Sequence, residues 1–400
     1  MRSRSQYIIT KDEVHGYANH WLSLSLKLEY EGTKCTAGTL LQILLIAAAR
    51  TVSIFAACRD LADAPTDQTI RNALAATLPE IAELQRRLNR SLATDLPKAL
   101  FRKSRRIAID LTLIPYHGQP HREKKEIYRS APKSGTTHFH AYATAAVVHK
   151  GHRYTLALLR VEHGTSMKEV VQRLIKIVRG RGVKIRYLLL DKGFFSVEVI
   201  DYLKRAQWGF IIPAVVRGRK PKGRKQATGL RAIRKKKNGY YPHTLTGKVN
   251  GKPRKTSVTI CVASKRYTHK KTDERRTKKL MYAISKVRLT PREIREMYRK
   301  RFGIETSYRQ MHEARIKTCT RDPSLRLLFI GIALVLRNIW VWLHFKLAKG
   351  KWREEPRLFL ELLRFREMLL WIAQVVGKLL HADEKQGIEY EKYRRLIKNY

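Results

Sequence analysis

The stretch Thr290–Lys317, TPREIREMYRKRFGIETSYRQMHEARIK, carries the strongest helix signals in the sequence. Thr290 followed by Pro291 is typical of an N-cap and a first helical residue, because the hydroxyl accepts from a free amide and proline has no amide to lose there. Glu293 completes a capping box with Thr290. Apolar residues then recur at helical spacing and predict one buried face: they are Ile294, Met297, Ile304 and Met311.

A second stripe on the same predicted helix mixes one carboxylate with cations and aromatic rings. Its members step by three and four residues, which places them on one helix face: Tyr298, Arg301, Glu305, Tyr308 and His312. An ordinary solvated face with Arg–Glu pairs is the simple alternative. A single carboxylate beside a buried face instead indicates a functional site if other carboxylates lie nearby.

The charge of the chain is the strongest global signal. The sequence has 83 Lys and Arg against 33 Asp and Glu, a formal net charge of +50 at pH 7. Self-repulsion of that size destabilises a compact chain unless a polyanion neutralises it, so we expect a nucleic-acid partner with salt-dependent affinity. The 44% hydrophobic content argues against wholesale disorder and favours a large folded core.

The cysteines and the apolar stretches bear on compartment. Cys35, Cys58, Cys261 and Cys319 form no close pair and no zinc-ligand spacing, so we expect reduced thiols in a cytoplasmic, nucleoid-associated protein. The basic start lacks an apolar segment and a cleavage site, so we expect no signal peptide. Ala37–Cys58 and Leu325–Phe345 contain charged or polar residues and are interpreted as buried core helices, with no membrane partner.

The predicted domains follow changes in pattern along the chain. Residues 1–100 form a helical DNA-binding domain, residues 101–320 alternate strands and helices, and residues 321–400 form a helical C-terminal region. A basic, β-rich insertion at about 215–280 precedes the Thr290 helix. The fold class is therefore α/β with a mixed sheet.

A helix-turn-helix reader is one interpretation of the amino-terminal region. Thr66 can cap a helix that begins at Asp67 and exposes Gln68, Arg71 and Asn72. Simple packing of a helical hairpin is the alternative, because it leaves the same pattern.

Three carboxylates lie on three elements of the α/β region. Asp110 is inside a strand-like run, Asp191 ends another, and Glu305 is on the Thr290 helix. Hard divalent ions prefer such oxygen ligands. In a phosphoryl displacement, two Mg²⁺ ions can activate the attacking oxygen and stabilise the leaving oxygen. The alternatives are a core pair between Asp110 and an arginine, and a turn capped by Asp191.

The order of these residues resembles the DDE transposases of bacterial insertion sequences. The resemblance is to the large cut-and-paste family with the signature Tyr-x2-Arg-x3-Glu-x6-Lys, whose first three positions match Tyr298, Arg301 and Glu305. IDLTLIPYHG around Asp110 and LLLDKGFFS around Asp191 look like the other two blocks of that family. Together the blocks cover roughly residues 102–320.

The resemblance implies a ribonuclease H-like catalytic core with a β-rich insertion before the last catalytic helix. Asp110, Asp191 and Glu305 would be catalytic and would bind two Mg²⁺ ions, for which Mn²⁺ can substitute. The partners would be double-stranded DNA, both transposon ends and target, and a second copy of the chain. Tyr298 and Arg301 would hold the cleaved strand.

The signature lysine falls on His312 in this sequence, with Arg315 and Lys317 nearby. The DNA contact of that lysine would pass to His312 or to one of these neighbours. Lys192, beside Asp191, would also contact DNA, with a solvated side chain as the simple alternative.

The predicted function is binding of terminal inverted repeats, metal-dependent cleavage and strand transfer. A ribonuclease H-like nuclease or resolvase would share the carboxylates but stop at hydrolysis. A non-catalytic nucleic-acid-binding protein would account for the charge alone.

Overall fold

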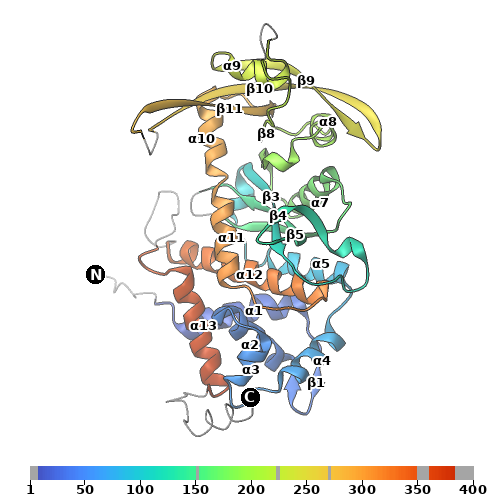
Figure 1. Cartoon of the computed structure of the whole chain (residues 1–400). Helices are drawn as coiled ribbons and strands as arrows, with labels where there is room; N and C mark the ends of the chain where they lie inside the picture. Colours follow the sequence, from blue (N-terminus) through green and yellow to red (C-terminus); the bar gives the residue numbers. More distant parts are fainter. Residues whose placement is uncertain (1–7, 150–152, 222–225, 269–271, 349–359, 383–400) are drawn as a thin grey trace, which may run out of the picture.

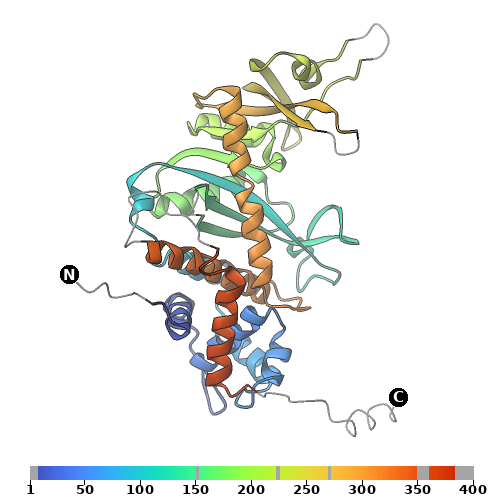
Figure 2. The same cartoon turned by 90° about the vertical axis from the view of Figure 1, so that its left-hand side faces the viewer.

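The computed structural model describes residues 8–149, 153–221, 226–268, 272–348 and 360–382 of the chain. Figures 1 and 2 show helices gathered at one end, a sheet in the middle and a long β-ribbon at the other end. Residues 383–400 of the predicted C-terminal region lie outside the described residues.

A nine-stranded mixed sheet runs from the centre of the molecule to the end where β9, β10 and β11 form the long β-ribbon (Figure 1). Its strands are β3 (Arg105–Pro115), β4 (Tyr128–Lys133), β5 (Thr136–Val147), β6 (Thr155–Val161), β7 (Ile185–Leu190), β8 (Phe210–Pro213), β9 (Gly239–Val249), β10 (Lys252–Thr268) and β11 (Arg275–Ser285). The order is β4-β5-β3-β7-β8-β11-β10-β9, and β6 also pairs with β5. The pairs β3–β7 and β7–β8 are parallel and the others are antiparallel, so the predicted mixed sheet is confirmed.

The predicted insertion continues the central sheet, because β11 pairs with β8 from Ser285↔Phe210 to Tyr282↔Pro213. Helix α9 (Gly229–Lys235) lies within this basic segment and was not expected. Strand β4 was also missed, since four of its six residues are exposed and it shows little apolar signal.

The two faces of the sheet are covered by different helices. On one face lie α7 (Met167–Gly180) and α8 (Val197–Arg205), whose apolar residues join the main core. On the other face lie α10 (Pro291–Lys300) and α11 (Gly303–Glu313), which form a second core with the strands. Figure 1 shows α10 and α11 as one rod from the β-ribbon to the helical end.

The helical end is built from both ends of the chain. Its helices are α1 (Lys11–Leu26), α2 (Ala37–Arg50), α3 (Ile54–Arg59), α4 (Asp67–Thr77), α5 (Ile81–Ser91), α6 (Ala99–Arg102), α12 (Pro323–Ala348) and α13 (Phe365–Leu379), with a short hairpin of β1 (Glu31–Gly32) and β2 (Cys35–Thr36). α13 packs on α1 and α2, and α12 packs on α5. The carboxyl-terminal helices therefore share one core with the amino-terminal ones.

Helix α12 is long and apolar enough to cross a membrane by length and composition. The most apolar 18-residue stretch within Pro323–Lys346 is 94% buried inside the protein. A span so enclosed by protein is a core helix, as predicted. α2 is likewise buried along most of its length.

The predicted helix over Thr290–Lys317 is two helices. Thr290 caps α10 with the complete capping box to Glu293, as predicted. The turn at Arg301 and Phe302 tightens, because the amide of Ile304 donates to Arg301 O at 2.8 Å and that of Glu305 to Phe302 O at 3.2 Å, both three residues back. Gly303 begins α11, where a Cβ would lie 2.9 Å from the guanidinium carbon of Arg153.

Candidate active site

Asp110 lies in the middle of β3 with 8% of its surface exposed. Apart from Asp110 and Thr112, residues 107–114 of this strand are apolar, and the strand's backbone holds the carboxylate against α10 and α11. Oδ1 accepts from the amide of Leu111 at 2.9 Å, and Oδ2 accepts from Arg301 at 3.0 Å. The carboxylate is buried, hydrogen-bonded and paired, as a buried charge requires.

Asp191 directly follows β7, the parallel neighbour of β3. Its Oδ2 accepts from the amide of Gly193 at 3.4 Å and caps the short 3₁₀ turn Lys192–Phe194. Its Oδ1 accepts from Arg301 at 3.0 Å. This turn cap is the simple alternative expected from the sequence. It uses only Oδ2, so Oδ1 of Asp191 faces Arg301.

Arg301 is the cation that the carboxylates share. Its guanidinium is 3% exposed and contacts Asp110, Asp191 and, at 3.8 Å, Glu305 Oε1. Its Nε is buried without a hydrogen-bond partner among the described residues. The structure thus brings together the three predicted carboxylates, and it also realises the expected alternative of Asp110 paired with a core arginine.

Two tyrosines fix the backbone around the carboxylates. Tyr298 OH donates to Leu190 O at 3.1 Å, and its ring lies under Arg301 at 5.4 Å. Tyr308 OH lies 3.2 Å from Asp110 O and 2.8 Å from Thr144 Oγ1 on β5. Tyr298 and Arg301 therefore point into the protein in this structure, and their predicted DNA contacts stay predictions.

Thr144 is a site residue that sequence reasoning missed. Its only signal would have been its register opposite Asp110 in the antiparallel pair β3–β5. That register is a tertiary fact. Tyr308 belongs to the helix stripe predicted from the sequence, but the sequence did not predict its contacts with Asp110 O and Thr144 Oγ1.

The electrostatics of the site favour a cation. The pKa of Asp110 is raised to about 6: burial is the largest cause, the positive charge of Arg301 counteracts it, and the nearby Asp191 carboxylate adds to it. A cation near both aspartates stabilises their ionised forms. In this structure the Arg301 guanidinium stands in for that cation.

The donor set suits a hard divalent ion, since three carboxylates from three elements converge on one positive group. In their present positions, no three His, Cys, Asp or Glu side chains of the described residues could hold one metal ion. Arg301 lies between the carboxylates. Metal binding at these ligands would therefore require the guanidinium to move.

The other predicted DNA contacts near the site are exposed. Lys192 is next to Asp191 on the 3₁₀ turn, and Lys317 follows α11 with its amide bonded to Val52 O at 3.0 Å. His312 is in the last turn of α11. Although His312 is exposed, the protein around its ring desolvates it and lowers its pKa, and the positive charges of Arg315 and Lys133 lower the pKa further.

The predicted base-reading residues lie elsewhere. Thr66 caps α4 as expected, and Gln68, Arg71 and Asn72 are exposed on it. Figure 1 places α4 in the helical end, apart from β3. The structure does not bring these residues to the carboxylates.

Comparison with known proteins identifies a family and a solved structure of similar fold. A family model described as "Transposase DDE domain" matches residues 101–339. A cryo-EM structure of the piggyBac transposase synaptic complex with hairpin DNA is similar in fold, with a TM-score of 0.53 and 12% sequence identity. The match covers 97% of this chain and 82% of that one. No curated protein sequence gives a significant match.

Proposed function

The chain belongs to the transposase DDE domain family, and on that premise we propose that it binds the terminal inverted repeats of an insertion sequence and moves it by cleavage and strand transfer. The observation that carries this proposal is the convergence of Asp110, Asp191 and Glu305 on one buried guanidinium. The net charge of +50 supports a DNA partner.

The proposed catalytic core is ribonuclease H-like and carries Asp110, Asp191 and Glu305. These carboxylates would hold two Mg²⁺ ions, or Mn²⁺ in their place. When bound, the metal supplies activation of the attacking oxygen and stabilisation of the leaving one. Tyr308 and Tyr298 hold the backbone at Asp110 and Leu190, so both aspartates keep fixed positions.

The remaining assignments follow from the same proposal. Residues 1–100 would read the DNA ends, residues 101–320 would carry the chemistry with the insertion at about 215–280, and residues 321–400 would complete the helical end. The active species on paired ends and target DNA would be a homodimer. The compartment would be the cytoplasm, on the nucleoid.

The test uses Asp110→Ala, Asp191→Ala and Glu305→Ala in cleavage and binding assays. Each should abolish cleavage in Mg²⁺ and leave DNA binding largely intact, because phosphate contacts come from Lys and Arg. Asp201→Ala is the matched control, since Asp201 is a carboxylate on α8 that pairs with exposed Arg205 at 2.9 Å. Near wild-type cleavage by Asp110→Ala would refute the assignment.

A substrate with a free 3′ hydroxyl separates the proposal from its alternative. A transposase joins that hydroxyl to target DNA, whereas a ribonuclease H-like nuclease or resolvase yields only hydrolysis products. Joined products that vanish in the three variants support the transposase.

A further inference from the structure

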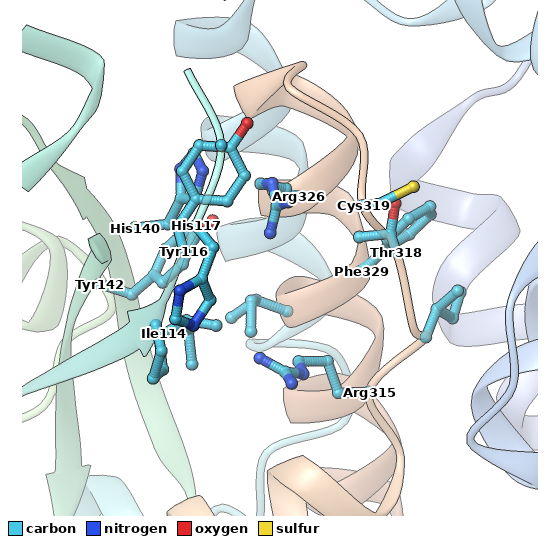
Figure 3. A pocket seen from close by; sticks show the side chains of 14 residues that line it. Ile114, Tyr116, His117, His140, Tyr142, Arg315, Thr318, Cys319, Arg326 and Phe329 are labelled. Carbon is cyan, nitrogen blue, oxygen red and sulfur yellow. The ribbon is translucent and has the colours of Figure 1, made fainter. Parts of the chain in front are cut away.

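A cavity of about 410 Å³ lies between the end of β3, the loop after α11 and the start of α12. Figure 3 shows Tyr116, His117 and His140 on one wall, with Arg315 and Arg326 pointing toward them. None of the described residues that line it is acidic. Cys319 lines the cavity and is exposed.

Two cations line this cavity, and the part of the chain that the structure describes offers them no counter-charge. Among the described residues, no carboxylate lies within ion-pair distance of Arg315 or Arg326. Arg326 donates from Nε to Thr320 O at 2.7 Å, and its guanidinium lies 4.6 Å from the centre of the Tyr116 ring. Burial lowers the pKa of Arg315, and the positive charge of Arg326 lowers it further. Two partly buried like charges without an anion are unfavourable.

Two buried polar side chains in the same wall find no hydrogen-bond partner in the part of the chain that the structure describes. His140 is 2% exposed, and neither ring nitrogen has a hydrogen bond among the described residues. Tyr142 is 1% exposed, and its hydroxyl likewise has none. Buried polar atoms are nearly always satisfied. Both residues line the cavity, so a group bound there can supply the missing partner once a small side-chain shift uncovers these atoms.

We propose that this cavity binds a phosphate group, held by Arg315 and Arg326 and hydrogen-bonded by Tyr142 and His140. Guanidinium pairs prefer phosphate oxygens, and a tyrosine hydroxyl can donate to the same anion. The cavity volume leaves space for part of the molecule to which the phosphate is attached.

The cavity lies on the same face of the sheet as the Asp110 carboxylate. Tyr142 pairs with Thr112 and His140 with Ile114, on the sheet face that also carries Asp110. Ile114 is four residues beyond Asp110, which is about 13 Å along a strand. A phosphate bound here could therefore belong to DNA that passes the carboxylates, and this source rests on the proposed function. A free phosphorylated small molecule is the other source.

Cys319 provides a chemical probe at the edge of the cavity (Figure 3). It is exposed, whereas Cys35, Cys58 and Cys261 are buried, so iodoacetamide should modify it selectively. The alkylation rate at Cys319 is measured by mass spectrometry on the full chain carrying Asp110→Asn, without divalent metal. Inorganic phosphate is titrated against chloride at equal ionic strength.

We expect phosphate, and not chloride, to slow alkylation with saturation. Arg315→Gln and Arg326→Gln should each raise the half-protecting concentration about tenfold or more, since each removes a charge-assisted bond. Arg309→Gln is the matched control, because Arg309 is exposed on α11 and does not line the cavity. Equal effects in all three variants would overturn the proposal.

Duplex DNA in place of phosphate identifies the source. Protection by DNA that is lost in Arg315→Gln and Arg326→Gln assigns a DNA phosphate, whereas protection by phosphate alone assigns a small molecule. No saturable protection of the Asp110→Asn chain by either overturns the inference, even if both arginine variants misfold. Because no cleavage is needed, this failure is distinct from a failure of the proposed transposition chemistry.

Discussion

Arg301 donates from Nη1 to Asp110 Oδ2 over 3.0 Å, and this pair joins the turn between α10 and α11 to the middle of β3. The two residues are 3% and 8% exposed. The arginine of the helix stripe is thus part of the buried core, where it neutralises the carboxylates that the proposed chemistry needs.

Arg301→Gln should destabilise the metal-free protein. Removing one partner of a buried pair leaves an uncompensated charge, a loss of about 3 kcal/mol or more in the free energy of unfolding. Urea unfolding in EDTA measures it, and Mn²⁺ should then stabilise the variant more than wild type. Arg299→Gln is the control, since Arg299 is exposed on the same helix and should change stability by less than about 0.5 kcal/mol. Equal stabilities of the two variants would contradict the prediction.

Arg71→Ala with Asn72→Ala should reduce the preference for end sequence over random DNA. Non-specific affinity should change less, because backbone contacts supply most of it. Stability should hardly change, since Arg71 pairs with Asp67 at 2.7 Å on an exposed face and such pairs contribute about 0–1 kcal/mol. Competition binding with both DNAs decides it, and equal losses on the two would show that α4 does not read bases.

His312→Lys should hold or improve end binding at pH 8, because it restores a permanent positive charge. The pKa of His312 is lowered from its usual 6.5, so the wild-type imidazole gains charge only below about pH 6.5. The affinity gap between wild type and His312→Ala should therefore widen as pH falls toward 6 and below. End-DNA affinities at pH 5.5 and pH 8 test this.

A pH-independent gap would refute the His312 contact. If His312 instead only packs beside Tyr308, His312→Lys should be neutral or destabilising. Lys317→Ala or Arg315→Ala would then be the damaging change.

His140→Phe should reduce the loss of unfolding free energy at acidic pH. The free energy of unfolding is measured as a function of pH in phosphate-free buffer. Burial, together with the positive charges of Arg326 and Arg160, lowers the pKa of His140 to about 3, whereas the unfolded chain binds this proton near pH 6.5. The unfolded state therefore gains protons first, and wild type should lose stability as pH falls from about 6.5 toward 3. The phenylalanine variant should lose less over that range and be at least as stable at pH 7.5, because two unpaired ring nitrogens are removed. Parallel profiles for the two proteins would disprove this account.

Local signals in the sequence determined most of the helices and strands. The Thr290–Glu293 capping box, the Thr66 cap and the apolar runs around Asp110 and Asp191 depend on neighbours within a few residues. These features could therefore be predicted from the sequence without knowledge of the tertiary structure. The order of the three carboxylates along the chain was readable for the same reason.

Only the tertiary structure decided where the polar groups of these elements point. The spacing of Arg301 left open whether it would meet solvent, DNA or protein. The parallel pairing of β3 and β7 placed Asp110 and Asp191 together, and the tight turn after α10 put the guanidinium between them. Likewise, the tertiary structure paired β11 of the insertion with β8 of the central sheet. It also placed Arg315 and His140 in the lining of the same cavity. These contacts join residues far apart in sequence, and their free energy depends on burial and distance, which no local pattern encodes.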